Sequence, residues 1–211
     1  MSAADPALPH DPSRAVAVLL AAGGGRRMGR PKALLALGGV PLALAVAARY
    51  AQCGVRPVLL VVGDDVRDLL SAAALRSELA TSLEWVEGAP ADAPMMQSVR
   101  RGLDRAMELG AELVFVQPVD AGPPLPSVLA ALRNALGERQ AAKPTHGGRG
   151  GHPVLLSAQA CVAVLAGDAA TLRDALAALG SDRIARVEVD DAGVLANWNR
   201  PGDLPEDLVG H

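Results

Sequence analysis

The sequence predicts an α/β protein, a single three-layer αβα domain built around a mostly parallel sheet. Short apolar segments with strand character alternate with longer helical segments along the 211 residues, which is the pattern of βαβ units. The first apolar segment, Ala15–Leu20, leads into three consecutive glycines, Gly23, Gly24 and Gly25. Ligands of such sheets bind beyond the carboxyl ends of the strands, so we expect the functional site at this junction.

Strands are predicted where short apolar runs are bounded by turn residues. The run 15–20 is apolar throughout, which is typical of a strand buried on both faces. Further strands are expected at 57–62, 83–86, 112–118 and 183–190. The segment 141–156 breaks the alternation because it is rich in glycine and proline, and we expect a loop or a β-hairpin flap there.

Helices are predicted for the longer segments between these strands. Pro41 opens the first and Gly54 ends it, since proline suits a first turn and glycine the position after the last. An acidic pair caps the second helix, whose inner face is expected to carry Leu69, Leu70 and Leu75. The expected helices are 41–53, 64–80, 96–109, 124 or 126 to 137, 158–166 and 169–179.

Composition favours one globular domain and excludes two kinds of partner. Half of the residues are hydrophobic, and the net charge is -3 with 2% aromatic residues, so the chain lacks the basic surface and stacking side chains of nucleic-acid binders. No apolar run approaches the roughly 20 residues that span a bilayer. We expect a cytoplasmic protein with no nucleic-acid and no membrane partner, in which residues 1–14 are a disordered lead and 15–211 the domain.

The glycine run is suited to holding phosphate groups. Glycine has no Cβ and permits positive φ, so the amides of Gly23, Gly24 and Gly25 can point at one anion. Arg27 and Lys32 add positive charge, and Lys32 is one of only two lysines among 20 basic residues. The P-loop pattern is excluded because Ala33 follows Lys32, and the dinucleotide pattern lacks its third glycine. We interpret the loop as a triphosphate cradle.

The spacing Leu-Ala-Ala-Gly-x-x-x-Arg-Met-Gly-x-Pro-Lys, from Leu20 to Lys32, resembles the signature of the MobA-like nucleotidyltransferases. It is most similar to the molybdenum cofactor cytidylyltransferase (MocA-like) branch. The resemblance extends from Ala15 to Asp203 and implies a Rossmann-like sheet of the nucleotide-diphospho-sugar transferase type. It also implies roles in nucleotide binding for Leu20, Ala21 and Ala22, together with the glycines, Arg27 and Lys32.

Asp120 is the first candidate metal ligand. A carboxylate beyond a strand end, close to phosphates, is what Mg²⁺ prefers, although an N-cap for the next helix is the simpler reading. The resemblance implies Asp120 and Asn199 as the two metal ligands. The family pattern is Asp-x-Pro, whereas this chain has one more residue in Asp120-Ala121-Gly122-Pro123.

Three further residues are assigned by the resemblance. Ser98, near the start of a helix, corresponds to a serine beside the base and ribose. Arg149 and His152, in the segment Arg-Gly-Gly-His-Pro, lie on the side where the acceptor enters, with Lys143 as a possible third anion contact. Ala22 stands where the cytidylyltransferases have alanine and the guanylyltransferases glycine, which favours CTP.

The resemblance therefore implies transfer of CMP from CTP to molybdopterin, a phosphorylated pterin-type acceptor, with Mg²⁺ as cofactor and release of pyrophosphate. A molybdenum hydroxylase apoenzyme is the implied protein partner. Two alternatives stay open on the sequence. One is a guanylyltransferase or another sugar- or alcohol-phosphate nucleotidyltransferase, and the other is a non-catalytic nucleotide-binding cofactor chaperone with the same fold.

Overall fold

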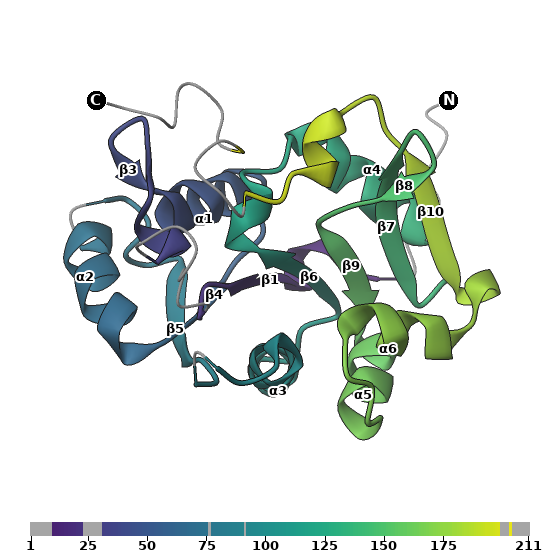
Figure 1. Ribbon diagram of the computed structural model, residues 1–211. Coiled ribbons are helices and arrows are strands. Elements are labelled where there is room, and N and C mark those ends of the chain that lie inside the picture. The colour runs from purple at the N-terminus through teal and green to yellow at the C-terminus, as the bar shows by residue number, and fades with distance from the viewer. Residues whose placement is uncertain (1–9, 23–30, 76, 91, 199–202, 204–211) are drawn as a thin grey trace.

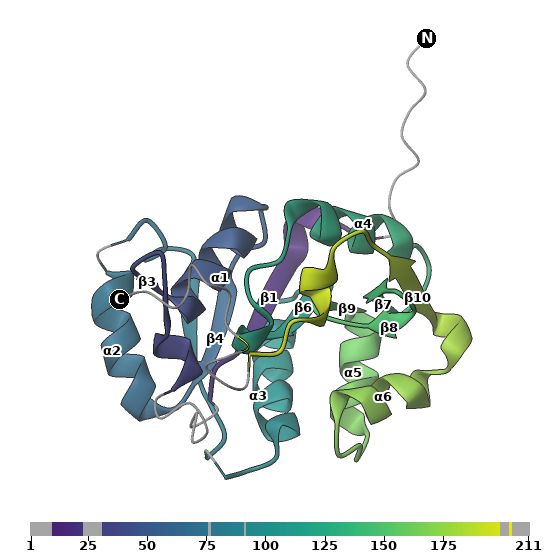
Figure 2. The same ribbon diagram turned by 45° about the horizontal axis from the view of Figure 1, so that its top comes forward.

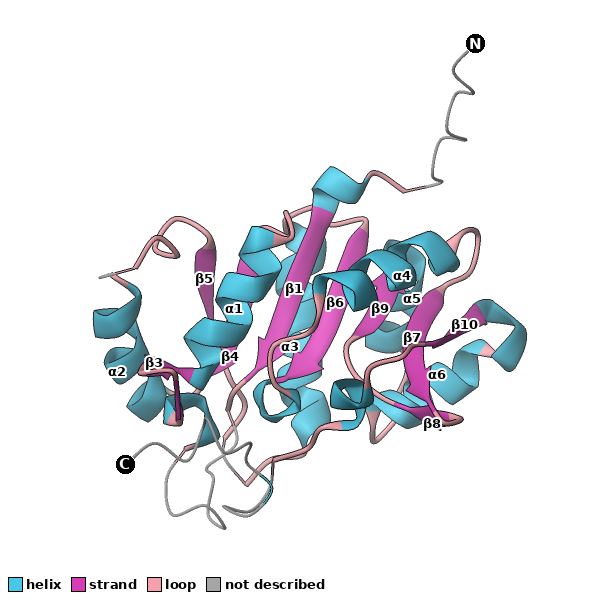
Figure 3. Cartoon of the chain, turned by 90° about the horizontal axis from the view of Figure 1, so that it is seen from above, coloured by secondary structure: helices cyan, strands magenta, loops and turns pink. Residues whose placement is uncertain are grey.

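The computed structural model describes residues 10–22, 31–75, 77–90, 92–198 and 203. Within them, eight strands form one sheet in the order β10-β7-β9-β6-β1-β4-β5, with β8 paired to β7. These strands are β1 (Ala15–Leu20), β4 (Val58–Val62), β5 (Leu83–Glu87), β6 (Leu113–Pro118), β7 (Ala141–His146), β8 (Arg149–Gly150), β9 (Val154–Ser157) and β10 (Ile184–Glu188). Figure 3 shows β1 and β6 side by side in the middle of the sheet.

Helices cover both faces of the sheet, so the expected three-layer αβα architecture is confirmed (Figures 1 and 2). One apolar cluster joins the sheet to the first, second and fourth helices, and the other joins it to the remaining three. The helices are α1 (Leu42–Gln52), α2 (Asp64–Ala74), α3 (Met95–Glu108), α4 (Pro126–Leu136), α5 (Ala158–Ala166) and α6 (Leu172–Leu179). In the described part of the chain, no helix is long and apolar enough to cross a bilayer.

Strand β1 is central because every one of its side chains is apolar and buried. It pairs in parallel with β4 on one side and with β6 on the other, and Leu20 is in register with Pro118. Parallel strands in register end at the same edge, so the segments that follow β1 and β6 start as neighbours. This edge is where the candidate site residues of both segments meet.

The expected flap over 141–156 is the main correction to the predicted fold. Only the turn and β8 form a hairpin, while β7 and β9 belong to the main sheet, and β9 runs antiparallel to both β6 and β7. Glycine is needed at the turn, where Gly147 and Gly148 have φ of 56° and 77°. Pro144 is tolerated because the ladder from β7 to β9 pairs only Ala141 and Ala142.

Two helices differ from their expected bounds. Helix α2 ends at Ala74, and its buried face is Val66, Leu70 and Ala74, which recur every four residues. Leu69 and Leu75, expected on that face, are 60% and 78% exposed. Helix α6 begins after Thr171, whose hydroxyl accepts the Asp174 N–H as an N-cap, and not at the expected residue 169.

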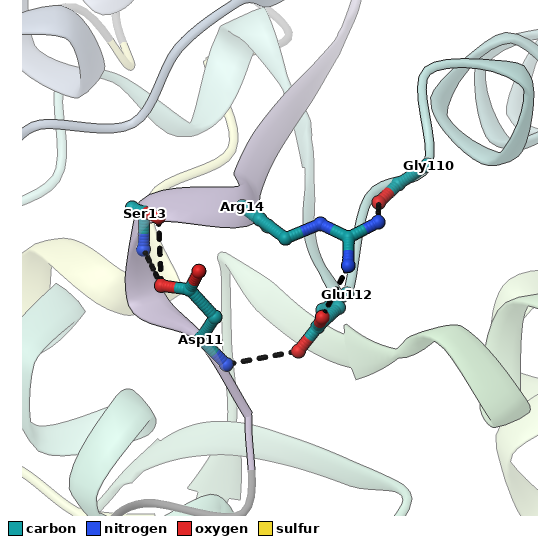
Figure 4. Close-up of polar contacts among 5 residues, drawn as sticks. All are labelled: Asp11, Ser13, Arg14, Gly110 and Glu112. Carbon is teal, nitrogen blue, oxygen red and sulfur yellow. Dashed lines mark hydrogen bonds and ion pairs between the residues drawn. The ribbon is translucent and has the colours of Figure 1, made fainter.

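Secondary structure is already present before residue 15. Residues Pro12–Arg14, expected in the disordered lead, form the 3₁₀ turn η1, which Asp11 caps by accepting the Ser13 N–H. The Arg14 guanidinium contacts both the Glu112 carboxylate and the Gly110 carbonyl, and the Asp11 N–H donates to Glu112 (Figure 4). The turn is thereby fixed to the segment that leads into β6, at the amino edge of the sheet.

Candidate active site

The first predicted contact residues come at the carboxyl end of β1. Leu20 and Ala21 are 7% and 3% exposed, and the Ala21 N–H donates to the Val61 carbonyl of β4 at 2.8 Å. Their side chains belong to the core and the Ala21 N–H is paired with β4, so their predicted contacts with a nucleotide stay predictions. Gly23, Gly24, Gly25 and Arg27 lie outside the described residues, and their predicted roles stay predictions.

Lys32 and Asp120 meet beyond the ends of β1 and β6. Lys32 opens the 3₁₀ turn η3 (Lys32–Leu34), and Asp120 lies in the 3₁₀ turn η4 (Val119–Ala121) directly after β6. The Lys32 Nζ and the Asp120 Oδ2 are 2.6 Å apart, and the two side chains are 18% and 19% exposed. A half-buried cation and carboxylate, 88 positions apart in the chain, are thus brought together where the sequence predicted phosphate and metal binding.

A residue near the C-terminal end of the chain, Trp198, also contacts the turn that carries Asp120. The Trp198 N–H donates to the Asp120 carbonyl at 3.0 Å, and the Trp198 ring lies against Gly122, where a Cβ would come within 2.6 Å of it. Gly122 has a φ of 72°, which favours glycine. Asn199 lies outside the described residues, but Trp198, its neighbour in the chain, contacts the turn that carries Asp120.

Ser98 links α3 to the loop after β5. Its side chain is buried, and its hydroxyl accepts the Ala89 N–H at 3.1 Å. The preceding Gly88 packs against Ala22, since a Cβ at Gly88 would come within 2.6 Å of the Ala22 Cβ. Ala22, Ser98 and this loop therefore gather near the end of β1, and the role of Ser98 beside the base and ribose stays a prediction.

His152 lies beside a cavity of about 130 Å³ near Asp120, lined by residues that include Gln117, Pro123, Leu125, Val194 and Trp198. The His152 N–H donates to the Val194 carbonyl at 2.8 Å. Its ring Nδ1 is buried and has no hydrogen-bond partner in the described part of the chain. Burial lowers the pKa of His152, opposed by the negative charge of Asp120, so burial favours the neutral form of the ring.

Arg149 and Lys143 stand apart from this cavity. Arg149 is exposed on β8 and does not line it. The Lys143 side chain lies over Gly150, and the pKa of Lys143 is lowered by burial and then by the nearby Arg186 and Arg173. The structure thus brings His152 to the site and leaves Arg149 on the surface of the hairpin.

Three residues near Asp120 were missed by the sequence reasoning. Gln117, Tyr50 and Trp198 hold the turn of Asp120 through hydrogen bonds and packing. One signal was present in the sequence, since Gln117 is the single polar residue in the otherwise apolar 113–118. Its partner Tyr50 could not have been found, because the two residues are 67 positions apart in the chain.

A divalent metal at this site would depend on ligands beyond the protein. Within the described residues, no three His, Cys, Asp or Glu side chains gather as a metal site. Asp120 supplies one carboxylate, which is compatible with Mg²⁺ because that ion is usually held by one or two carboxylates together with substrate phosphates. The donor set therefore fits a metal that arrives with a nucleotide.

Several solved structures share the fold of this chain. Rv0371c from Mycobacterium tuberculosis H37Rv has a TM-score of 0.74 at 20% identity, over 93% of this chain and 99% of its own. A nucleotidyl transferase from Methanothermobacter thermautotrophicus has a TM-score of 0.73 at 24% identity, over 89% and 93%. The 4-diphosphocytidyl-2C-methyl-D-erythritol synthase from Anaerococcus prevotii has a TM-score of 0.69 at 15% identity, over 92% of both chains. These likenesses show that the chain shares the fold of these proteins.

The sequence comparison identifies the class. A family model described as the MobA-like NTP transferase domain matches residues 17–187. Together with the fold and the site, this match defines a nucleotidyltransferase, an enzyme whose substrate is a nucleoside triphosphate. The chain belongs to the MobA-like NTP transferase family, as its glycine loop predicted. No match was found among curated proteins.

Proposed function

We propose that the protein transfers a nucleoside monophosphate, CMP from CTP, to a phosphorylated pterin-type acceptor and releases pyrophosphate. The observation that carries the proposal is the contact between Lys32 and Asp120 at the shared edge of β1 and β6. It puts a cation suited to phosphate beside a carboxylate suited to Mg²⁺. Transfer at the α-phosphorus needs positioning and neutralisation of charge more than acid or base groups.

Each residue of the pair has a separate role in this proposal. Lys32, with Arg27 and the amides of Gly23–Gly25, holds the phosphates and stabilises the departing pyrophosphate. Asp120, with Asn199, holds Mg²⁺, which when bound neutralises phosphate charge and orients the reacting oxygen. In the described structure the Lys32 ammonium pairs with the Asp120 carboxylate, so on nucleotide binding a phosphate would become the partner of Lys32 and Asp120 would be left to hold the metal.

The acceptor is assigned to the cavity beside His152. Its walls combine apolar side chains, such as Pro123 and Leu125, with the polar Gln117 and His152, as is usual for small-molecule sites. A neutral His152 ring can accept or donate a hydrogen bond without adding charge. Because the cavity adjoins the turn of Asp120, a phosphate carried by an acceptor there would lie toward the metal.

CTP is favoured over GTP by the contact between Ala22 and Gly88. There is no space for even one more methyl group at Gly88, so the end of β1 and the loop after β5 approach each other closely. In the proposal, this close approach leaves less room for the base and so supports a smaller one. One methyl group in a pocket is worth about 1–3 kcal/mol, enough for a preference between bases. A molybdenum hydroxylase apoenzyme is the corresponding recipient of the product.

The direct experiment measures pyrophosphate release from each of the four nucleoside triphosphates with Mg²⁺, without an acceptor and with either molybdopterin or 2C-methylerythritol 4-phosphate. The proposal expects release with CTP that requires the acceptor and is lost in Asp120→Asn. Release only with 2C-methylerythritol 4-phosphate would reassign the acceptor to the sugar-phosphate class. Binding of nucleotide with no turnover on any acceptor would instead favour the non-catalytic chaperone.

A further inference from the structure

Gln117 is a buried polar residue in the apolar strand β6. It is 1% exposed, and both ends of its amide are hydrogen-bonded. The Tyr50 hydroxyl of α1 donates to its Oε1 at 2.7 Å, and its Nε2 donates to the Gly122 carbonyl. Buried amides are unfavourable unless both ends are satisfied, so Tyr50 and Gly122 together account for its presence in the core.

The second partner, Gly122, belongs to the turn that carries Asp120. Opposite the bond from Gln117, the Trp198 ring packs on Gly122, and the Trp198 N–H donates to the carbonyl of Asp120. The turn is thus held from the core by Gln117 and from the outside by Trp198. Its carboxylate points to Lys32.

The turn from Asp120 to Pro123 includes Gly122. Glycine has more backbone freedom than other residues, so this turn needs a restraint to keep its carboxylate in one place. We propose that Gln117, oriented by Tyr50, is the positioning residue that fixes this turn and keeps Asp120 placed for the metal–nucleotide complex. The inference rests on the proposed function of Asp120.

The direction of the hydrogen bonds explains why Tyr50 is needed. The Gly122 carbonyl can only accept, so Gln117 must present its NH₂ there and its oxygen to a donor. Burial raises the pKa of Tyr50 well above its ordinary value, with a further contribution from Cys53, so the hydroxyl keeps its proton. Phenylalanine would keep the ring packing on Phe115, whose centroid is 5.7 Å away, and would remove only this donor.

The test uses the full chain with Trp85→Phe, which leaves Trp198 as the single tryptophan. We call the hydrogen bonds from Tyr50 to Gln117 and from Gln117 to Gly122 the relay. Tyr50→Phe and Gln117→Met each remove one side chain of the relay. Ser157→Ala is the matched control, since it removes another buried hydrogen bond, the N-cap of α5. Acrylamide quenching of Trp198 reports on the turn, and a titration with Mn²⁺ and a non-hydrolysable CTP analogue reports on metal–nucleotide binding.

We expect both relay variants to increase the quenching of Trp198 and to raise the Mn²⁺ midpoint about tenfold, the usual effect of losing a residue that orients a metal ligand. Ser157→Ala should lower thermal stability without either effect. Unchanged quenching in both relay variants, or an equal midpoint shift in Ser157→Ala, would overturn the inference. Failure of the wild type to bind nucleotide would overturn the proposed function instead. The quenching of Trp198 would still test whether the relay fixes the turn.

Discussion

At the scale of single residues, the ion pair of Lys32 and Asp120 is the centre of the candidate site. A salt bridge that is about four-fifths removed from solvent contributes little net stability, because desolvation offsets the attraction between the charges. Its position at the edge of the sheet is better explained by chemistry. In the proposed reaction, phosphate would replace Asp120 as the partner of Lys32, and the metal would replace Lys32 as the partner of Asp120.

The first prediction concerns Lys32. Lys32→Ala should lower turnover at least about a hundredfold, which is the scale of losing one preorganised charge donor, as measured by pyrophosphate release. Arg14→Ala is the control, since it also removes a cation from an ion pair but at the opposite edge of the sheet. Turnover of Lys32→Ala close to that of Arg14→Ala would reject the phosphate role.

The second prediction concerns the pH dependence of stability at His152. Its pKa is lowered in the folded state from 6.5, so between the two values the unfolded chain binds more protons than the folded chain. The stability that the neutral His152 ring contributes is therefore fully present above pH 6.5, and it is lost as the pH falls from 6.5 through the lowered pKa of the folded state. Urea unfolding should show a smaller loss of stability on acidification in His152→Gln than in wild type.

His146→Gln is the control for that measurement, because the His146 Nδ1 already contacts the Val189 carbonyl at 2.9 Å. It should keep the acid sensitivity of the wild type. If His152→Gln and wild type lose stability in parallel, the His152 ring binds protons equally well in the folded and the unfolded chain. The interpretation that burial favours its neutral form would then be wrong.

At the scale of elements, a close contact joins α3 to the central strand. Gly102 of α3 lies on the Val18 side chain of β1, and a Cβ there would overlap Val18 Cγ1. This close approach brings the helix that carries Ser98 onto the strand that leads into the glycine loop. The position of Ser98 relative to the carboxyl end of β1 therefore depends on the small size of Gly102.

The third prediction follows from that contact. Gly102→Ala should destabilise the protein by about 1–3 kcal/mol, the usual cost of overpacking a core, as measured by urea unfolding. The control Gly167→Ala adds the same methyl group after α5, where the nearest atom is 3.4 Å away. Equal effects of the two substitutions would show that loss of glycine, and not contact with Val18, causes the change.

The sequence predicted most elements because their signals are local. Hydrophobic periodicity and capping residues located β1, α1 and α3 within a few residues. Strands β7 and β9 were missed because their glycines and prolines indicate turns, while their membership in the sheet depends on pairing with distant β6. The same limit applies to the site, where spacing pointed to Lys32 and Asp120 but not to Tyr50 and Gln117, whose contact spans 67 positions.

At the scale of the whole molecule, the chain returns to the site from the far edge of the sheet. After β10, the 3₁₀ turn η6 (Ala192–Leu195) passes His152, and Trp198 reaches Asp120. Figures 1 and 2 both show this yellow segment alongside the teal turn after β6. Ligands at the site therefore contact early, middle and late parts of the chain, and their binding should stabilise the entire fold.

The fourth prediction tests this coupling by thermal shift with the four nucleoside triphosphates, with and without Mg²⁺. A ligand at 100 times its Kd should raise the free energy of unfolding by about 2.7 kcal/mol, and CTP with Mg²⁺ should give the largest shift. Asp120→Asn should lose the increment that Mg²⁺ adds. A Mg²⁺ increment of equal size in Asp120→Asn would place the metal elsewhere.

The fixed turn η1 has a practical consequence for handling the protein. It anchors the start of the domain at the amino edge of the sheet, and the six residues of β1, at about 3.3 Å each, separate that edge from the site by roughly 20 Å. An affinity handle or a surface-immobilisation linker joined before η1 would therefore leave substrate access open. Attachment at that end is the arrangement of choice for sensor-chip and pull-down experiments.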